Sequence, residues 1–375
     1  MLSYVKSGDP KDTLQTIVLG DDEWSAPNTF AYGENWFINW ADYPSVVYVN
    51  EGLHGPVFFY HFLEYSGEGT YDYDIKYGQT GDKGIRFESA KLHKDGISAE
   101  HGFLSSARLP GGDLQVSWLD GRNTKVAAAN TVGVYAEQSR STGAKDVEGH
   151  GHGHGGAMSL RTKALSDSTS VELDNRVCDC CGTATAVNDE LTMVAYRDRS
   201  DDEVRDISYV VKPHGGEWSA PLPIHQDGWE ISGCPVNGPA LAASGADIVA
   251  AWYTEADDEP AIKFSWFNHT GNQKFSDPIT LPGAKPLGRV DVQLSKKGGT
   301  AYITGLTATE NPDSAALMLW TVDAVGNKKQ EQLGITAAAR SSGFPKTALF
   351  QDRFYWAKTV IGKDREEQFV EVCWK

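Results

Sequence analysis

A short turn motif that recurs along the chain constrains its fold more than any other feature. Close copies of an aromatic–Ser–x–Pro string occur at Trp24–Pro27, Trp218–Pro221 and Phe275–Pro278, with a looser copy at Phe87–Ala90. The copies are separated by roughly 60 residues, or by about twice that distance between Phe87 and Trp218, as expected if one copy had been lost. Since the chain has 375 residues, a unit of roughly 60 residues fits into it about six times.

A second alignment identifies the segments that open the units. In each unit a polar or Gly/Pro-containing segment is followed by a turn and then by an apolar run typical of a β-strand. The opening segments are Trp40–Ser45, His101–Ser105, Cys180–Thr183, Cys234–Pro239, Gly288–Asp291 and Ser342–Pro345. The apolar runs are Pro56–Tyr60, Leu114–Trp118, Leu191–Tyr196, Ile248–Trp252, Thr300–Thr304 and Arg353–Ala357.

Six similar four-stranded units predict an all-β chain folded as a six-bladed β-propeller. We expect an N-terminal strand near Leu14–Leu19 to close the last blade, which would protect both edges of its sheet. The 11 Trp, 15 Tyr, 14 Phe and 39 Gly residues suit short strands joined by tight turns. Two β-sandwich domains are the alternative. The prediction is one domain over residues 1–375, with a His/Gly-rich loop insertion at about 139–170.

Charge and hydropathy exclude two classes of partner. The net charge is −17 and the chain has no dense Lys/Arg run, so a nucleic-acid partner is not expected. No stretch approaches the length of about 18 apolar residues that a membrane-spanning helix needs. The first residues, Met1–Gly20, also lack the apolar core of a signal peptide.

Several strings along the chain carry a family resemblance. Thr80–Phe87 fits the Asp-box pattern S/T-x-D-x-G-x-x-W/F, a β-turn in which Asp caps backbone amides. From roughly residue 36 to residue 345 the chain resembles the bacterial sialidase-like (BNR or Asp-box) six-bladed propellers that are often labelled exo-α-sialidases. The other matching strings are Glu100–Phe103, Trp118–Arg122, Cys178–Cys181, Tyr196–Ser200, Arg205–Ile207, Gly233–Pro239, Gly288–Asp291 and Ser342–Pro345.

The resemblance implies a location but no reaction. Such propellers are usually exported, so we expect a periplasmic or extracellular protein whose leader is missing here; a cytosolic location is the alternative. Sialidases bind the sugar carboxylate through three arginines, and the chain lacks the Phe-Arg-Ile-Pro string that normally supplies the first one. No catalytic residue is therefore transferred, because a fold by itself does not specify an activity.

The inner strands of a propeller begin at one mouth of its central channel, and the opening segments gather polar residues there. Glu100 beside His101 is a candidate acid/base pair, although adjacent strand residues point to opposite faces. The predicted channel-mouth residues are Asp42, His101, Arg197, Arg199, Asn237, Arg289 and Asp291, joined by Cys178, Cys180, Cys181 and Cys234.

The four clustered cysteines leave three interpretations open. They form a soft-metal site for copper or zinc, with His101 as a further ligand. Alternatively, Cys180 or Cys181 forms a disulfide with Cys234 in the next blade, which suits an oxidising compartment. The third interpretation is a redox-active vicinal pair, Cys180–Cys181. Cysteines that simply stay reduced in the core are the structural alternative to all three.

A second candidate metal site is the alternating tract His150, His152 and His154, which lies within the predicted insertion. A solvated loop without a physiological ligand is the alternative. We expect the protein to bind a soft metal, a small molecule or a protein at the cysteine-rich mouth rather than to cleave sialosides. The competing hypothesis is a glycoside hydrolase that acts on acidic sugars.

Overall fold

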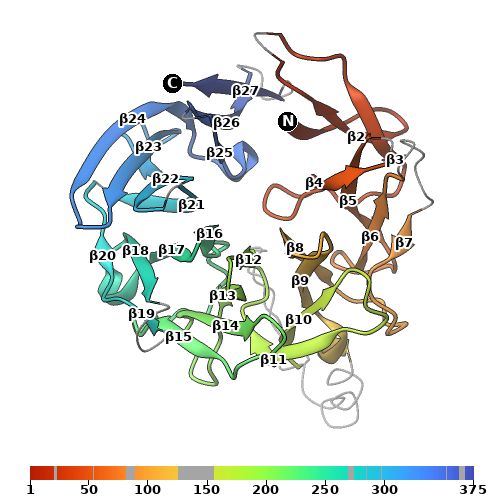
Figure 1. The fold of residues 1–375 in the computed structure, drawn as a ribbon, viewed down its shortest axis with the longest axis horizontal. Coiled ribbons are helices and arrows are strands. Elements are labelled where there is room, and N and C mark those ends of the chain that lie inside the picture. Colours follow the sequence, from red (N-terminus) through yellow and green to blue (C-terminus); the bar gives the residue numbers. More distant parts are fainter. Residues whose placement is uncertain are drawn as a thin grey trace, which may run out of the picture.

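The computed structural model is a β-propeller in which seven sheets surround a central opening (Figure 1). The structure describes residues 1–20, 23–53, 55–81, 89–125, 156–268, 274–283, 285–296, 298–351, 353–362 and 368–375. Each sheet is antiparallel, and consecutive strands of the chain are neighbours in it, except that β20 of the fifth sheet pairs with β18. Figure 1 shows the first strand of each sheet from the second onward nearest the central opening.

The first three sheets contain the N-terminal half of the chain. The first sheet consists of β1 (Leu2–Lys6), β2 (Asp12–Ile17) and β3 (Asn28–Gly33). The second consists of β4 (Ser45–Gly52), β5 (Gly55–Tyr65), β6 (Tyr73–Gln79) and β7 (Ala90–Lys91). The third consists of β8 (His101–Arg108), β9 (Leu114–Asp120), β10 (Met158–Ala164) and β11 (Val171–Val177).

The other four sheets complete the ring. The fourth consists of β12 (Ala184–Val187), β13 (Leu191–Arg197), β14 (Ile207–Pro213) and β15 (Leu222–His225). The fifth consists of β16 (Ala240–Ser244), β17 (Asp247–Thr254), β18 (Ala261–Asn268), β19 (Lys274–Phe275) and β20 (Ile279–Thr280). The sixth consists of β21 (Pro286–Leu294), β22 (Thr300–Ala308), β23 (Ser314–Asp323) and β24 (Lys328–Ala337). The seventh consists of β25 (Lys346–Phe350), β26 (Arg353–Ile361) and β27 (Gln368–Trp374).

The predicted propeller is confirmed, but it has seven blades and not six. The six opening segments each precede or begin one of sheets two to seven, so the repeat itself was identified correctly. The additional blade is the N-terminal sheet. Its central strand β2 contains most of the segment predicted to close the last blade, yet it pairs with β1 and β3. The expected closure by Leu14–Leu19 is therefore wrong, because the N-terminal segment forms a sheet of its own.

The repeated turn motif makes the same contacts wherever the structure describes it. In the copies that contain Ser25, Ser219 and Ser276, the serine N–H donates to a backbone carbonyl. The hydroxyl oxygen of the same serine accepts the N–H of the residue that carries this carbonyl. Thr80 makes the same pair of bonds with Phe58. The motif thus attaches an outer turn to its own blade, and residues 82–87 of the Asp box lie outside the described residues.

The core consists of layers between consecutive sheets. Six clusters of buried side chains fill the six interfaces from sheets one and two to sheets six and seven. Trp118, Trp252 and Trp320 are among the largest fully buried side chains and lie in three of these interfaces. Because aromatic side chains bury large areas, they provide much of the packing that holds the ring together.

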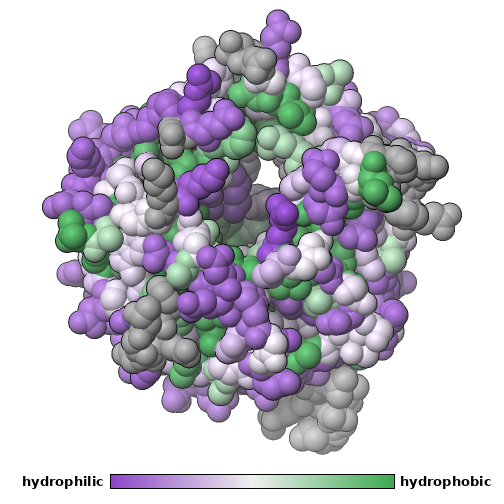
Figure 2. Space-filling model, viewed as in Figure 1, coloured by the Kyte–Doolittle hydropathy of each residue, from purple (hydrophilic) through white to green (hydrophobic). Residues whose placement is uncertain are grey.

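The centre of the ring is open and has a polar rim (Figure 2). Part of the predicted insertion at 139–170 belongs to the third sheet, since it includes β10 and the turn before β11. Residues 126–155, with His150, His152 and His154, lie outside the described residues. No helix among the described residues is long and apolar enough to cross a membrane.

Candidate functional site

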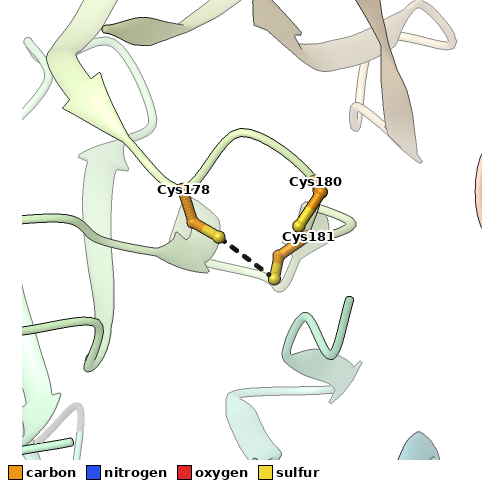
Figure 3. Close-up of side chains that lie close together, drawn as sticks. All are labelled: Cys178, Cys180 and Cys181. Atoms are coloured by element: carbon orange, nitrogen blue, oxygen red, sulfur yellow. Dashed lines mark hydrogen bonds between the residues drawn. The ribbon is translucent and has the colours of Figure 1, made fainter. Parts of the chain in front are cut away.

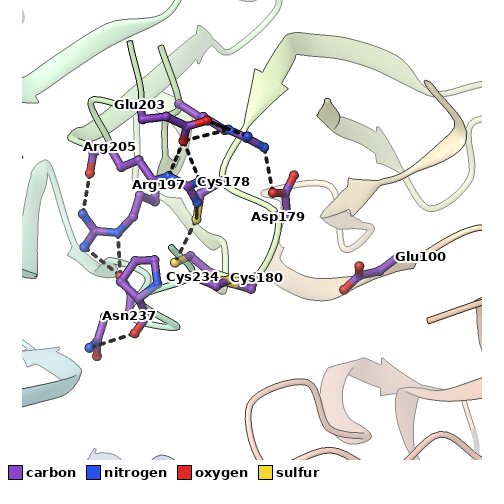
Figure 4. Close-up of a disulfide and its surroundings, with 12 residues drawn as sticks. Glu100, Cys178, Asp179, Cys180, Arg197, Glu203, Arg205, Cys234 and Asn237 are labelled. Carbon is purple, nitrogen blue, oxygen red and sulfur yellow. Dashed lines mark hydrogen bonds and ion pairs between the residues drawn. A yellow bond between two sulfur atoms is a disulfide. The ribbon is translucent and has the colours of Figure 1, made fainter. Parts of the chain in front are cut away.

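The loops that precede β12 and β16 bring four cysteines to one side of the channel mouth. Cys180 and Cys234 form a disulfide with a Cα–Cα distance of 6.1 Å, which links the openings of the fourth and fifth sheets. Of the predicted alternatives, the structure therefore contains the inter-blade disulfide. Both bridged cysteines are partly accessible and line a small pocket of about 70 Å³ (Figure 4).

Two free thiols lie directly behind this disulfide. Cys178 and Cys181 are fully buried, and their sulfur atoms are 3.3 Å apart (Figure 3). The Sγ atoms of Cys178, Cys180 and Cys181 all lie within 4.8 Å of one another. A thiol pair and a disulfide sulfur therefore occupy one small volume, which is the arrangement that thiol–disulfide exchange requires.

An arginine polarises the inner thiol pair. The Arg205 guanidinium donates to the Cys178 sulfur at 3.3 Å and is held from its other side by Glu203 (Figure 4). Burial by itself would raise the pKa of Cys178, but the Cys181 thiol and the Arg205 charge outweigh it and lower that pKa to about 6. Burial and the neighbouring Cys178 raise the pKa of Cys181 well above its usual value. These opposite shifts of the two pKa values favour the thiolate form at Cys178 and the protonated thiol at Cys181.

The predicted arginines hold the backbone around this site and are not free to bind a ligand. Arg197 is fully buried and donates four hydrogen bonds, at 2.6 to 2.9 Å, to the carbonyl oxygens of Asn237, Arg205 and Tyr253. Its guanidinium lies over the Trp229 ring, 4.8 Å from the centroid. Arg197 therefore connects the fourth sheet to the loop that carries Cys234.

The other predicted polar residues are also held by contacts within the protein. Arg289 donates to Ser342 and to backbone carbonyls of residues 338, 339 and 343. Arg199 is paired with Asp179 and Glu203. The Asn237 side chain accepts the Arg289 N–H, and Asp291 accepts two hydrogen bonds from Thr347. No arginine triad for a carboxylate ligand is formed by Arg197, Arg199 and Arg289.

Two carboxyl groups and a tyrosine form the other wall of the pocket. The Tyr73 hydroxyl is 3.0 Å from Asp42 Oδ2 and 3.0 Å from Glu100 Oε1. Asp42 and Tyr73 are almost fully buried, and all three residues line the pocket with Cys180 and Cys234. The remaining lining residues are Phe37, Asn39, Trp40, Ala41, Tyr71, Phe103, Asp179, Val236 and Arg340.

The tyrosine bridge requires a proton on at least one of the two carboxyl groups. The phenol has one proton to donate but contacts two carboxyl oxygens, so the second contact is a hydrogen bond only if a carboxylic acid donates to the phenol oxygen. The pKa values agree with this count. Burial raises the pKa of Asp42 to about 7, and burial with the nearby charges of Asp42 and Asp179 raises the pKa of Glu100 to about 8.

We expect Glu100→Gln to change the pH dependence of stability. The folded protein holds the Glu100 proton more tightly than the unfolded chain, in which the pKa is about 4.3. Wild-type stability should therefore decline as the pH rises from that value through the folded pKa of about 8. Glutamine cannot ionise. The unfolding free energy of the variant minus that of wild type should therefore be larger at pH 9 than at pH 5. Urea unfolding at both pH values, with exposed Glu310→Gln as control, measures the difference; an equal difference at both pH values contradicts the assignment.

His101 does not reach the channel mouth, and that part of the sequence prediction is corrected. Its side chain is fully buried, and its ring lies 3.6 Å from the His93 ring among three aspartates. It therefore contacts a separate cluster between the second and third sheets and none of the cysteines. Glu100, predicted as its acid/base partner, contacts Tyr73 instead.

Sequence reasoning missed Tyr73 and Arg205 as members of the site. Tyr73 begins β6, which is two strands away from the inner strand β4. The alignment of the segments that open the inner strands therefore did not include it. Arg205 lies in a run of alternating charges that reads as a surface turn, although it is buried. A larger groove of about 710 Å³ lies between the third and fourth sheets and contains none of the predicted site residues.

Comparisons with known proteins bear on the fold alone. No protein-family model matches the sequence, and no curated protein matches it. Among solved structures, AofleA from Arthrobotrys oligospora is similar with a TM-score of 0.50 and 9% identity, over 91% of this chain and 86% of that one. The GH93 α-L-arabinofuranosidase of Fusarium graminearum with arabinobiose gives a TM-score of 0.49 and 12% identity, over 89% and 92% of the two chains. The α-L-arabinanase of Penicillium chrysogenum with arabinobiose gives 0.49 and 9%, over 88% and 92%. At these identities the likeness extends to the β-propeller fold and no further.

Proposed function

We propose that the channel mouth is a thiol–disulfide exchange site, in which the Cys180–Cys234 disulfide reacts with an external thiol. The observation that carries the proposal is the buried Cys178 sulfur, which lies within 4.8 Å of the Cys180 sulfur and 3.3 Å from the Arg205 guanidinium. A thiolate, rather than a thiol, is the attacking species in exchange, and a nearby cation increases its population. Arg205 supplies that cation.

The exchange consists of two displacements that balance without any other reagent. An external thiolate attacks Cys180 Sγ, the Cys180–Cys234 bond breaks, and Cys234 leaves as a thiolate that takes up a proton. The Cys178 thiolate then attacks Cys180 Sγ, which forms a Cys178–Cys180 bond and releases the external thiol. Glu100 lines the same pocket and carries a proton near neutral pH, so it can supply the proton to the leaving thiolate.

Reduction of the disulfide would prepare the same site for a soft metal. With Cys180 free, three thiol sulfurs would be close together and Cys234 would be near them, and thiolates are ligands that Cu(I) and Zn(II) favour. The sialidase-like ancestry and a periplasmic or extracellular location stay part of this proposal, since a disulfide at the mouth suits an oxidising compartment. The external ligand is a thiol compound or a protein cysteine.

A titration in glutathione buffers tests the proposal. The protein is equilibrated at a series of ratios of reduced to oxidised glutathione, quenched in acid, alkylated and mapped by peptide mass spectrometry. Within the range that glutathione covers we expect Cys234 to be reduced reversibly while Cys180 is linked to Cys178. At the most reducing ratios a second glutathione thiolate should reduce that linkage as well, and only the fully reduced protein should bind one equivalent of Cu(I) or Zn(II). Structural disulfides resist the glutathione pool, so a bridge that stays oxidised at every ratio in the folded protein overturns the proposal.

The carboxyl pair favours a second candidate function, a glycoside hydrolase. Two contacts of 3.0 Å to one hydroxyl place Asp42 Oδ2 and Glu100 Oε1 no farther apart than twice that distance. This is below the roughly 6.5 Å minimum for inverting glycosidases and compatible with the shorter spacing of about 5 to 5.5 Å in retaining ones. The pocket contains Asp42, Glu100 and Asp179 against Arg340 alone, so it favours a neutral sugar over an acidic one.

A panel of neutral and acidic aryl glycosides distinguishes the two functions. The hydrolase hypothesis expects release of the aryl group from a neutral glycoside and loss of that activity in Glu100→Gln. The thiol-exchange hypothesis expects no turnover by wild type. A signal that persists in Glu100→Gln would come from another part of the chain or from a contaminant and would contradict the assignment to this pocket.

A further inference from the structure

The groove of about 710 Å³ between the third and fourth sheets lies at the end of the propeller opposite the cysteine-rich mouth. Its walls contain Gln115, the second residue of β9, and Thr192, the second residue of β13. Arg197, which holds the mouth loop, is the last residue of β13, so the groove and the mouth lie at opposite ends of this strand. Among the described residues, the groove and the pocket at the disulfide share no lining residue. The groove volume falls within the roughly 300 to 1,000 Å³ typical of small-molecule sites.

An amide oxygen at the floor of the groove is free to accept a hydrogen bond. Gln115 is 5% exposed, and its amide nitrogen donates to Thr162 Oγ1 at 2.6 Å. Thr162 donates its own proton to the Val116 carbonyl at 2.8 Å, so the Gln115 group that faces it must be the amino group of the amide. Gln115 Oε1 is left over, and within the described part of the chain it accepts no hydrogen bond. Because a nearly buried acceptor without a partner costs free energy, a ligand that donates to Oε1 would be bound more tightly.

A hydroxyl and an ammonium group face the same space from the fourth sheet. Thr192 and Lys212 are paired across β13 and β14, so their side chains are neighbours on one face of the sheet. Thr192 is 3% exposed, and its hydroxyl has no hydrogen-bond partner among the residues that the structure describes. Lys212 forms no ion pair with these residues either, and its Nζ lies 6.0 Å from the centroid of the Trp218 ring. The fourth sheet therefore offers one group that donates and one that both donates and accepts.

Trp218 forms an aromatic wall of the groove. It belongs to the repeated turn motif, and Ser219 fixes that turn through hydrogen bonds of 2.8 and 3.0 Å with the backbone of Val211. The Trp218 ring is partly buried against the apolar cluster between the third and fourth sheets, which holds it at the edge of the groove. The face of an aromatic ring is electron-rich, so it attracts the weakly positive C–H groups of a sugar ring.

The charges along the groove disfavour an anionic ligand. The described lining contains four carboxylate residues and two lysines, namely Asp167, Glu172, Asp189, Glu217, Lys163 and Lys212. All four carboxylate residues are exposed, whereas the nearly buried Gln115, Thr162 and Thr192 are uncharged. The inner part of a ligand therefore meets amide and hydroxyl groups, which suits neutral hydroxyl groups that both donate and accept.

We propose that this groove binds a neutral oligosaccharide, with one sugar ring packed on Trp218 and its hydroxyl groups bonded to Gln115, Thr192 and Lys212. One sugar hydroxyl donates to Gln115 Oε1, and another accepts from Lys212 Nζ. The Thr192 hydroxyl bonds either of them, since it can donate or accept. The site is independent of the disulfide and of the carboxyl pair at the mouth.

Calorimetric titration of the wild-type chain with defined oligosaccharides tests this site. The neutral panel contains maltotriose, cellotriose, xylotriose, mannotriose and arabinotriose, and the acidic counterparts are sialyllactose and trigalacturonic acid. We expect at least one neutral trisaccharide to bind with one equivalent per chain, and the acidic ones to bind at least tenfold more weakly. Trp218→Ala should weaken binding at least tenfold. Thr192→Val keeps the side-chain shape and should weaken binding about 5- to 10-fold, as expected for the loss of one hydrogen bond.

Two matched variants keep the experiment decisive. Thr307→Val makes the same change at a buried threonine of β22 in the sixth sheet and should leave the affinity unchanged. Glu100→Gln alters the mouth pocket and should leave it unchanged as well, so a loss of binding in this variant would place the sugar at the mouth and overturn the proposal. The proposal is also overturned if no neutral trisaccharide binds at millimolar concentration, or if an acidic one binds more tightly. Full affinity in Thr192→Val, or in a folded Trp218→Ala variant, has the same consequence.

Discussion

In a protein that lacks Cys234, removing Cys178 as well is expected to raise the amount of persistent glutathione adduct on Cys180 at least tenfold. Oxidised glutathione first forms a mixed disulfide with Cys180 in both proteins. When Cys178 is present, its thiolate displaces glutathione, because its sulfur lies within 4.8 Å of Cys180 Sγ and the Cys181 thiol and the Arg205 charge lower its pKa. When Cys178 is serine, no thiolate replaces it. Intact-mass spectrometry after an acid quench counts the adduct.

Cys181 provides the matched control for this experiment. Its sulfur also lies within 4.8 Å of the Cys180 sulfur, but burial and the neighbouring Cys178 raise its pKa, so we expect it to attack slowly. Cys181→Ser in the same Cys234→Ser protein should therefore still release glutathione. Cys373 is replaced by serine in every sample, because it is a free thiol on β27. Equal adduct in the Cys178 and Cys181 variants would mean that Cys178 has no special role.

The second large effect concerns stability. Arg197→Ala is expected to lower the free energy of unfolding by about 3 kcal/mol or more, because it leaves three buried carbonyl groups with fewer partners. The guanidinium donates to Asn237, Arg205 and Tyr253, so it holds together the backbone of two sheets and the loop that carries Cys234. Urea unfolding followed by tryptophan fluorescence measures the change.

Arg161 is the control for the loss of an arginine as such. It forms a partly exposed ion pair with Glu172 at 2.7 Å, and surface pairs contribute at most about 1 kcal/mol. Arg197→Lys should lose much of the stability that Arg197→Ala loses, because one ammonium group cannot reach three carbonyls in fixed directions. If Arg197→Ala proves as mild as Arg161→Ala, the guanidinium does not hold the mouth together.

The sequence predicted the repeat because each of six units begins with a recognisable segment and continues into an apolar strand. The N-terminal sheet escaped detection because it has no such segment and contributes few buried residues. Leu14 and Phe30 are buried against the second sheet, whereas β1 has no fully buried side chain. A three-stranded sheet with so little apolar patterning looks like one closing strand with flanking loops.

The candidate site was partly predictable for a similar reason. Register placed Cys180 and Cys234 at the starts of neighbouring inner strands, where the structure joins them. The same logic placed His101 at the mouth, but its side chain lies inside the adjoining interface with His93 and Asp74. The register of an inner strand predicts which mouth of the propeller a residue lies near. It does not predict the direction in which the side chain points. Tyr73 came from a different strand, and only tertiary packing brings it between Asp42 and Glu100.

The mouth thus combines two kinds of chemistry that the sequence had suggested separately. The disulfide and the carboxyl pair line one pocket, and the guanidinium groups of Arg197 and Arg289 are hydrogen-bonded within the protein. A proton on Glu100 beside a disulfide favours the departure of a thiolate, which connects the acid group to the exchange reaction.

The central claim is that the disulfide at the mouth exchanges with the buried thiol pair, and a disulfide map of the wild-type chain tests it most directly. Folded protein is incubated with a small amount of reduced glutathione, quenched in acid and digested without reduction. We expect peptides that link Cys178 to Cys180 or to Cys181 to appear beside those that link Cys180 to Cys234. A map that contains only the Cys180–Cys234 linkage, with Cys178 and Cys181 always free, would contradict the claim.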